Sequence, residues 1–199
     1  MPKMVDHEER REEVVAAACR VILREGIEAA TTRAIAREAG YSNGVLTHYF
    51  ADKDEILLSA LRSSHRRIVA RLRGKLAGRT GYAALRELLL DNLPLDDERA
   101  RETGLEVGFW SRSLTSTALL EVQREEAAEL RYLVRSLLGA AAEAGEITTG
   151  EDLDDVAERL LALVDGLSVR RLLYPDVLGA ERLERLLTAE LDRLAATPS

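Results

Sequence analysis

The sequence predicts an all-α protein of about nine helices, and three observations support this prediction. Apolar residues make up 46% of the 199 residues and charged residues 32%, and only 4 prolines are present to interrupt helices. Apolar residues recur at helical spacing along most of the chain, and no alternating pattern is long enough to predict a strand. A chain of this length can bury a hydrophobic core in one or two domains.

The first three helices have the layout of a helix-turn-helix unit. Over residues 7–25 an apolar stripe recurs at i, i+4, i+7 and i+8, which predicts a first helix. The segment ATTRAIAREAG predicts a second helix that Thr31 or Thr32 caps and Gly40 ends. Ser42 caps a third short helix that runs through NGVLTHYF. Two short helices joined by a tight glycine-containing turn are typical of units whose second helix enters the major groove of DNA.

The remaining helices follow with little interruption. A fourth begins at ADKDE, where Asp52 and Glu55 have the spacing of a capping box, and runs to about Arg73. Five more helices are expected in the segments GYAALRELLLDNLP, DDERARETGLEVGFWSRS, residues 117–144, DLDDVAERLLALVDGLSVRRLL and GAERLERLLTAELDRLAA.

Composition excludes several classes of protein. No stretch approaches the roughly 18 consecutive apolar residues of a membrane span, so we expect no membrane partner. Residues 1–13 are charged and lack an apolar core, which argues against a secretory signal. Cys19 is the only cysteine, so no internal disulfide can form, and we expect the protein to be cytoplasmic. Its place beside the first apolar stripe predicts a buried residue rather than a nucleophile.

Charge is distributed unevenly along the chain. Residues 1–79 hold 15 basic and 11 acidic residues, a net charge of +4, whereas residues 80–199 hold 13 and 24, a net charge of −11. This asymmetry favours contact between the N-terminal part and a polyanion. The alternative is that the arginines of residues 62–79 form only a solvated, basic helix end.

The segment EGIEAATTRAIAREAGYSNGVLTHYFADKDEILLSAL carries a family resemblance. With its glycine turn, its G-x-L-x-x-Y-F third helix and its x-K-D-E-x-L start of helix four, the chain over residues 10–61 resembles the TetR family of one-component transcriptional regulators. The resemblance implies a three-helix helix-turn-helix DNA-binding domain over residues 1–52 and a helical effector-binding and dimerisation domain over residues 53–199. Thr47 departs from the family, which commonly has a phosphate-contacting tyrosine at this position.

Short polar side chains in and around the third helix are the candidates for contact with double-stranded DNA. Exposed polar groups can reach base edges, and Gly44 allows close backbone approach. For His48 the alternative is a merely exposed side chain, and for Tyr49 it is partial core packing. The expected major-groove residues are Ser42, Asn43, Gly44, Thr47, His48 and Tyr49, and the expected phosphate contacts are Thr32, Arg33 and Lys53.

A homodimer is expected for two reasons. One short recognition helix reads too few base pairs to find a single genomic site, so two copies on a roughly palindromic operator are needed. The last two helices are also apolar on more than one face, and the resemblance implies that they pair with their two-fold mates as a four-helix bundle. The candidate interface residues are Leu160, Leu161, Val164, Gly166, Leu167, Leu183, Leu186, Leu187 and Leu191.

Residues 80–199 contain no histidine, cysteine, lysine or methionine. The usual nitrogen and sulfur ligands of zinc and copper are therefore missing, as are the commonest acid–base residues and nucleophiles. We therefore expect no enzyme activity, no metal and no cofactor. Two alternatives stay open: a helical enzyme with an N-terminal module that does not bind DNA, and a family member that regulates without a ligand.

The resemblance implies a small-molecule effector in the C-terminal domain, and we expect this effector to be mostly apolar and neutral or cationic. An anion would find no lysine or histidine there, whereas a cation could use a carboxylate and the face of Trp110. The segment LPLDDERARETGLEVGFW resembles the subgroup of choline-responsive betaine regulators. For the aliphatic candidates the alternative is ordinary core. The candidate pocket residues are Tyr82, Leu85, Leu89, Glu102, Leu105, Glu106, Phe109, Trp110, Leu130, Leu133, Val134, Leu137 and Asp165.

Overall fold

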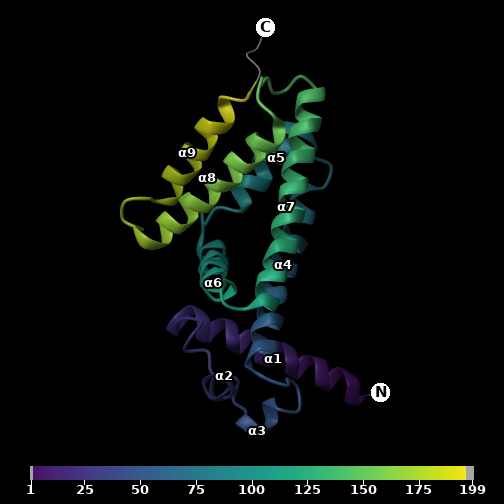
Figure 1. The fold of residues 1–199 in the computed structure, drawn as a ribbon, viewed down its shortest axis with the longest axis vertical. Coiled ribbons are helices and arrows are strands. Elements are labelled where there is room, and N and C mark those ends of the chain that lie inside the picture. Colours follow the sequence, from purple (N-terminus) through teal and green to yellow (C-terminus); the bar gives the residue numbers. More distant parts are fainter. Residues whose placement is uncertain (1, 196–199) are drawn as a thin grey trace. The chain divides into compact units, whose positions relative to one another are not determined.

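The computed structural model describes the backbone of residues 2–195 and the side chains of residues 7–195. Within these residues the chain forms nine α-helices and no strand beyond one isolated bridge, which confirms the all-α prediction (Figure 1). The helices are α1 (Pro2–Glu25), α2 (Thr32–Ala39), α3 (Asn43–Leu46), α4 (Lys53–Leu76), α5 (Gly81–Asp91), α6 (Asp97–Ser113), α7 (Thr117–Glu143), α8 (Leu153–Leu173) and α9 (Ala180–Asp192).

Helices α1 and α3 differ in length from the prediction. Helix α1 begins at Pro2 rather than near residue 7, since proline is tolerated in the first turn of a helix. Helix α3 ends at Leu46 rather than continuing through NGVLTHYF. The amide of His48 donates to the carbonyl of Val45 at 3.1 Å, three residues back, so the helix tightens into a turn.

The helices form two compact units. The first comprises the described part of residues 1–67 together with residues 104–123, and the second comprises residues 68–103 and the described part of residues 124–199. Helices α4, α6 and α7 each contribute residues to both units. The predicted functional boundary after residue 52 stays a prediction, because packing alone does not show which residues bind DNA.

The core of the first unit collects apolar residues from α1, α2, the α3 segment, α4 and α6. Ile35, Leu46 and Phe109 are among its fully buried side chains. Cys19 is buried here as expected, and its burial raises the pKa of the thiol. Two glycines of α6 allow a close crossing with α1: a Cβ at Gly104 would lie 3.3 Å from the Leu23 side chain.

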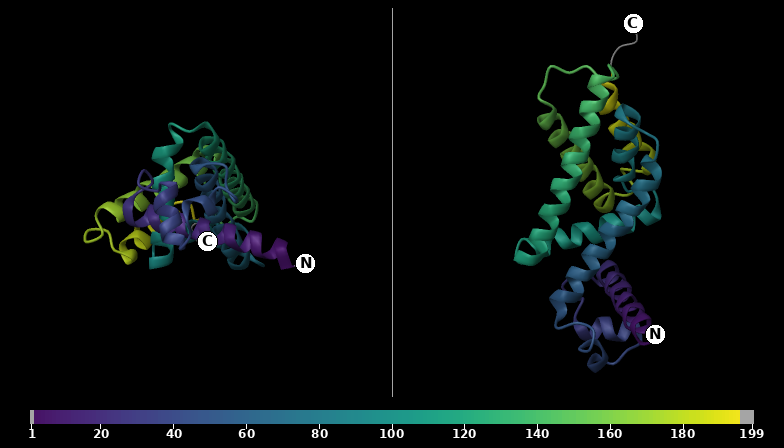
Figure 2. Two further views of the ribbon diagram at one scale, coloured as in Figure 1. Left: turned by 90° about the horizontal axis from the view of Figure 1, so that it is seen from below. Right: turned by 90° about the vertical axis from the view of Figure 1, so that its right-hand side faces the viewer.

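The core of the second unit is built mainly from leucines of α5, α7, α8 and α9. Helices α8 and α9 pack against each other, and α9 also packs against α5 (Figure 2). The start of α5 is fixed by Gly81, whose φ of +58° is unfavourable for other residues. There the amide of Tyr82 donates to the Glu146 carboxylate at 2.8 Å. In the described part of the chain, none of the helices has the length and apolar character needed to cross a membrane.

Candidate nucleic-acid interface

Helix α2 is fixed at both ends by its own sequence. The Thr31 hydroxyl accepts a hydrogen bond from the amide of Ala34 at 3.2 Å, so Thr31 rather than Thr32 is the N-cap. Gly40 ends the helix in the left-handed region at φ +75°, and the amide of Tyr41 donates to the carbonyl of Ala36 at 2.9 Å. Helix α2 is thereby followed by an abrupt turn into α3, as the glycine predicted.

The α3 segment has a buried side and a solvent side. Leu46 and Phe50 are buried in the core of the first unit. The polar candidates predicted for the major groove face solvent, apart from Tyr49, which is half-buried. The exposed candidates are Ser42, Asn43, Gly44, Thr47 and His48. Ser42 makes no side-chain capping bond within the described residues, so the hydroxyl is not used to cap α3.

Gly44 lies on the solvent side of α3 without a structural need for glycine. Its φ is not positive. A Cβ at this position would meet the Ser42 Oγ atom at 3.9 Å, an ordinary van der Waals distance. Glycine inside a helix costs stability, about 0.5–1 kcal/mol relative to alanine. The packing of this chain therefore does not explain why residue 44 lacks a side chain.

Thr47 uses its hydroxyl locally. The Oγ1 atom donates a hydrogen bond of 2.8 Å to the carbonyl of Gly44. This bond helps to end α3, and it occupies the hydroxyl proton that Thr47 could otherwise offer to DNA. A DNA contact through Thr47 would require the hydroxyl to change partner or to act as an acceptor.

Tyr49 shows the partial core packing that was its alternative, and its contact with DNA stays a prediction. Its ring is partly buried and packs against the core of the first unit. The ring also lies against the imidazole of His7, with centroids 4.6 Å apart, and its hydroxyl accepts a hydrogen bond of 3.2 Å from Arg10. Neither His7 nor Arg10 was predicted as part of the site, because sequence spacing does not show that this part of α1 lies beside the end of the α3 segment.

The predicted phosphate-contacting residues flank the α3 segment along the chain. Arg33 is exposed in the first turn of α2, whereas Thr32 and Lys53, the first residues of α2 and α4, are half-buried. The capping box of α4 is present in a shifted form: Asp52 accepts from the amide of Glu55 at 2.9 Å, and Glu55 accepts from the amide of Ala51 at 2.6 Å. This backbone bond, aided by Arg11, lowers the pKa of Glu55.

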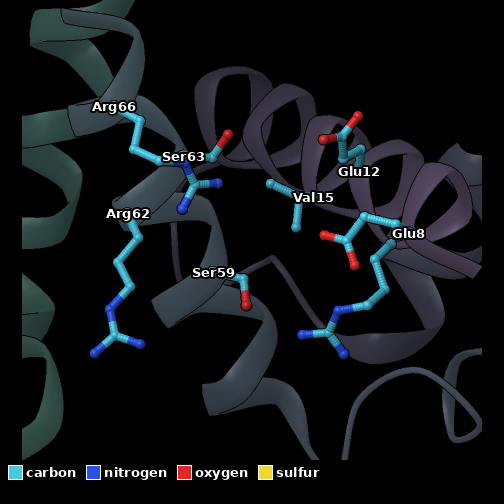
Figure 3. Close-up of a pocket in the computed structure, with 8 residues that line it drawn as sticks. Glu8, Glu12, Val15, Ser59, Arg62, Ser63 and Arg66 are labelled. Carbon is cyan, nitrogen blue, oxygen red and sulfur yellow. The ribbon is translucent and has the colours of Figure 1, made fainter. Parts of the chain in front are cut away.

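A groove of about 190 Å³ lies between α1 and α4 (Figure 3). Both signs of charge line it, with carboxylates on α1 and guanidinium groups on both helices. Its lining residues are Glu8, Arg11, Glu12 and Val15 of α1 and Ser59, Arg62, Ser63 and Arg66 of α4. This groove could not be predicted from sequence, because α1 and α4 are far apart in the chain.

The candidate effector residues are divided between the two units. Leu105 and Phe109 pack in the core of the first unit, where α6 crosses α1. The candidates of α5 and α7 pack in the core of the second unit, and they are Tyr82, Leu85, Leu89, Leu130, Leu133, Val134 and Leu137. That α5 and α7 present these residues to Leu105, Phe109 and Trp110 stays a prediction, because the two sets belong to different units.

Glu102 already has a strong partner. Arg71 binds it in a bidentate manner, at 2.8 Å and 2.7 Å. The Nε atom of Arg71 donates to Asp91 at 3.0 Å, and Lys75 binds the other Asp91 oxygen at 2.6 Å. The hydrogen bonds to Glu102, together with Asp91, raise the pKa of Arg71. The charges of two carboxylates and two cations are thus balanced within this network. The network was not predicted from the sequence.

Glu106 and Trp110 form a second polar cluster, in the first unit. The Trp110 indole donates to Glu106 at 3.1 Å, and the other Glu106 oxygen lies 3.1 Å from the Nε2 atom of His65, which is buried. His65 was not predicted, because its partner comes from a distant helix. Asp165, the third candidate carboxylate, is exposed on α8 in the second unit.

Most of the candidate dimer residues pack in the core of the second unit. The buried ones are Leu160, Val164, Leu167, Leu183, Leu187 and Leu191. Leu161 is half-buried, whereas Gly166 and Leu186 are exposed. Three further apolar residues, Leu173, Tyr174 and Val177, are exposed where α8 leads into α9.

Known proteins resemble this chain over nearly its whole length. Residues 14–60 match bacterial regulatory proteins of the tetR family, and residues 82–196 match the C-terminal domain of BetI-type transcriptional repressors. The HTH-type transcriptional regulator PksA of Bacillus subtilis is 30% identical over 195 residues, covering 98% of this chain and 94% of PksA. BetI of Stenotrophomonas maltophilia is 31% identical over 197 residues, covering 96% of each protein.

Solved structures of transcriptional regulators also match nearly the whole chain. A transcriptional regulator from Rhodococcus sp. Rha1 has a TM-score of 0.85 at 31% identity, covering 95% of this chain and 99% of that one. A regulator from Saccharomonospora viridis, crystallised with choline, has a TM-score of 0.90 at 22% identity, covering 96% and 100%. These relatives are transcriptional regulators and not enzymes. The chain belongs to the TetR family of helix-turn-helix transcriptional regulators, with a C-terminal region of the BetI type.

Proposed function

We propose that this regulator represses transcription by binding a roughly palindromic operator as a homodimer, and that a small-molecule effector releases it. The observation that carries the proposal is the solvent side of the α3 segment. Exposed hydroxyl, amide and imidazole groups surround a glycine that the fold does not need. Such a surface fits close approach to base edges, and it differs from an ordinary solvated helix face of Glu, Lys and Arg.

DNA binding is tested by selection from a random pool of duplexes, followed by fluorescence anisotropy at several salt concentrations. Selected sites should be roughly palindromic, with half-sites about 34–36 Å apart or a multiple of one helical turn. Binding to random duplex should be weaker and should depend strongly on salt. If selection enriches no sequence and binding to duplex DNA is independent of salt, the proposal is wrong.

The proposed dimer would use the outer surface of α8 and α9. Leu161, Gly166 and Leu186 lie outside the buried core, and the exposed turn between the helices adds Leu173 and Tyr174. Association of two copies would remove this apolar surface from water. Sedimentation should therefore give a dimer at micromolar concentration, and a monomer under these conditions would contradict the proposed pairing.

The proposed effector is mostly apolar and neutral or cationic. The structural relative from Saccharomonospora viridis was crystallised with choline, a cation, which supports this class without identifying the compound. The protein can adopt one conformation that binds DNA and one that does not. For release, the effector must have a higher affinity for the conformation that does not bind DNA. Glu106 and Trp110 are the proposed contacts for positive charge, because a carboxylate and an indole ring already lie together there.

Intrinsic fluorescence offers a direct test, because Trp110 is the only tryptophan. Candidate cations and neutral compounds should change its emission and release a labelled operator over the same concentration range. Suppose that an organic anion releases the operator at micromolar concentration from both the wild type and a Trp110→Ala variant. This result would contradict the proposed charge of the effector and its proposed binding site beside Trp110. If thermal-shift screening never finds a stabilising compound, regulation without a ligand becomes the better interpretation.

A further inference from the structure

We propose that the groove between α1 and α4 binds a small zwitterion, a molecule with an ammonium group at one end and a carboxylate at the other. The groove measures about 190 Å³, below the roughly 300–1,000 Å³ of pockets for drug-sized ligands, so it suits a molecule of about amino-acid size. Its lining residues all belong to the first unit, and none is among the proposed contacts for DNA or for the effector. The inference therefore adds a second ligand site and does not depend on the proposed function.

The two walls of the groove carry opposite charges. Helix α1 contributes Glu8 and Glu12, and α4 contributes Arg62 and Arg66. Figure 3 shows the Glu8 carboxylate and the Arg66 guanidinium turned toward the space between the helices. In the described part of the chain, neither of these two side chains has an ion-pair partner. A ligand can therefore meet both charges without first breaking an ion pair.

The third guanidinium of the lining is already engaged. Arg11 donates to the carbonyl of Tyr49 and binds Glu55 at 3.1 Å. Its guanidinium also lies 4.2 Å from the centre of the Phe50 ring. Arg11 is thus held by the turn that follows α3 and by α4, and it does not pair with Glu8. The unpaired positive charge of the groove comes from the α4 wall, opposite the carboxylates of α1.

The α4 wall also offers neutral donors beside its positive charge. Four lining residues recur at i, i+3, i+4 and i+7, so they share one face of α4: Ser59, Arg62, Ser63 and Arg66. Both serines are half-buried. A guanidinium presents a planar fork of donors that matches a carboxylate, and a neighbouring hydroxyl can donate a further hydrogen bond. The carboxylate of the ligand therefore belongs on the α4 wall, and its ammonium group belongs at Glu8.

A ligand with only one charge gains less from this groove. A simple carboxylate is attracted by Arg66 but repelled by Glu8, and for a simple ammonium ion the two effects are reversed. A neutral molecule gains neither attraction. One hydrogen bond to a charged group corresponds to roughly a 10- to 150-fold change in affinity, and the open groove places the expected change at the lower end, about 10-fold.

The test is isothermal titration calorimetry on the full chain without DNA, at pH 7 and low salt. The probes are 4-aminobutyrate, butyrate and butylamine, which share a four-carbon chain and differ in charge. At this pH the amine and the carboxylate are both ionised, and low salt limits the screening of exposed charges. The wild type should bind 4-aminobutyrate about 10-fold more tightly than either analogue. β-Alanine and 6-aminohexanoate, with shorter and longer spacing between the charges, show which separation fits best.

Two variants test the walls separately. Glu8→Gln and Arg66→Gln should each weaken binding of 4-aminobutyrate about 10-fold. Glu8→Gln should also bind butyrate as tightly as 4-aminobutyrate, and Arg66→Gln should bind butylamine as tightly, because one wall no longer carries charge. A merely structural defect would not produce this exchange of selectivity. Glu9→Gln and Arg73→Gln are the matched controls, since both residues are exposed on the same helices outside the lining, and both variants should keep the affinities of the wild type.

The inference is overturned if none of the three zwitterions binds the wild type more tightly than butyrate and butylamine do. It is also overturned if Glu8→Gln and Arg66→Gln keep the affinities of the wild type, since the ligand would then bind elsewhere. Circular dichroism melting shows whether each variant is folded, and the comparison of ligands on the wild type needs no variant. A chain that binds 4-aminobutyrate as expected but no duplex DNA would refute the proposed function and support this inference.

Discussion

Replacing Gly44 by alanine should separate the stability of the α3 segment from its ability to bind DNA. The new Cβ would lie 3.9 Å from the nearest heavy atom, the Ser42 Oγ, so the fold has room for it. Alanine in a helix is favoured over glycine by about 0.5–1 kcal/mol, which in a chain of this size raises Tm by about 1–4 °C. The four-residue length of α3 places the expected gain at the lower end of that range.

Operator affinity should change in the opposite direction. If the α3 backbone approaches base edges at Gly44, a methyl group there forces the two surfaces apart. Overpacking of this kind costs roughly 1–3 kcal/mol in a close-packed contact, which corresponds to about a 5- to 150-fold loss of affinity. Fluorescence anisotropy with the selected operator measures this loss, and differential scanning calorimetry measures Tm.

Gly74→Ala is the matched control for this experiment. Gly74 lies exposed near the end of α4, has no positive φ, and would place its new Cβ more than 4 Å from the atoms around it. It should gain stability without any change in operator affinity. Unchanged affinity for Gly44→Ala would refute the close approach at α3, and a lowered Tm would refute the argument that the fold tolerates a side chain there.

Three other substitutions test particular steps. Asn43→Ala should weaken binding to the selected operator more than binding to random duplex, because contacts to bases determine sequence specificity whereas contacts to phosphates only orient the protein. Equal losses of affinity for the two duplexes, measured by anisotropy, would contradict a base contact. Lys53→Ala should weaken both alike and reduce the salt slope by about one per half-site, and an unchanged slope would argue against its phosphate contact. Gly81→Ala should lower the free energy of unfolding, measured by urea titration, by at least about 1 kcal/mol. The φ angle of residue 81 is +58°, and the new Cβ would collide with the Glu146 carboxylate. Unaltered stability would show that the start of α5 can relax.

Local signals predicted the helices well because each one depends on residues close together in the chain. The stop at Gly40 follows from the preference of glycine for positive φ, and the cap at Thr31 follows from hydroxyl chemistry next to an apolar run. The predicted end of α3 was wrong, and the reason is equally local. The Thr47 hydroxyl and the amide of His48 donate hydrogen bonds to carbonyls three residues earlier, which ends the helix.

Partners from distant helices could not be predicted in the same way. Periodicity shows which face of α6 is apolar, but not that Leu105 and Phe109 belong to a different core from Leu85. The partner of Glu102 is Arg71, which precedes it by 31 residues, and no spacing rule links these positions. The contact of Arg10 with Tyr49 spans 39 residues and likewise requires the folded chain.

The partners of the carboxylates limit where an effector can place positive charge. Taking Arg71 away would leave the largely buried Glu102 carboxylate without its bidentate partner, and the fully buried Asp91 would keep Lys75 but lose one of its two cations. Breaking a buried ion pair in this way costs about 3–5 kcal/mol, which a cationic effector would have to exceed before gaining any affinity. A cation that binds Glu106 would not have to replace a guanidinium, since the neighbours of Glu106 in the cluster are the Trp110 indole N–H and the ring of His65. A quarter of the Glu106 side chain is also exposed. A cation can therefore approach Glu106 without displacing a guanidinium, and the Trp110 ring beside it can add attraction of its own. On these grounds, Glu102 serves to hold α6 to α4 and α5, and Glu106 is the carboxylate that would distinguish a cationic effector from a neutral one.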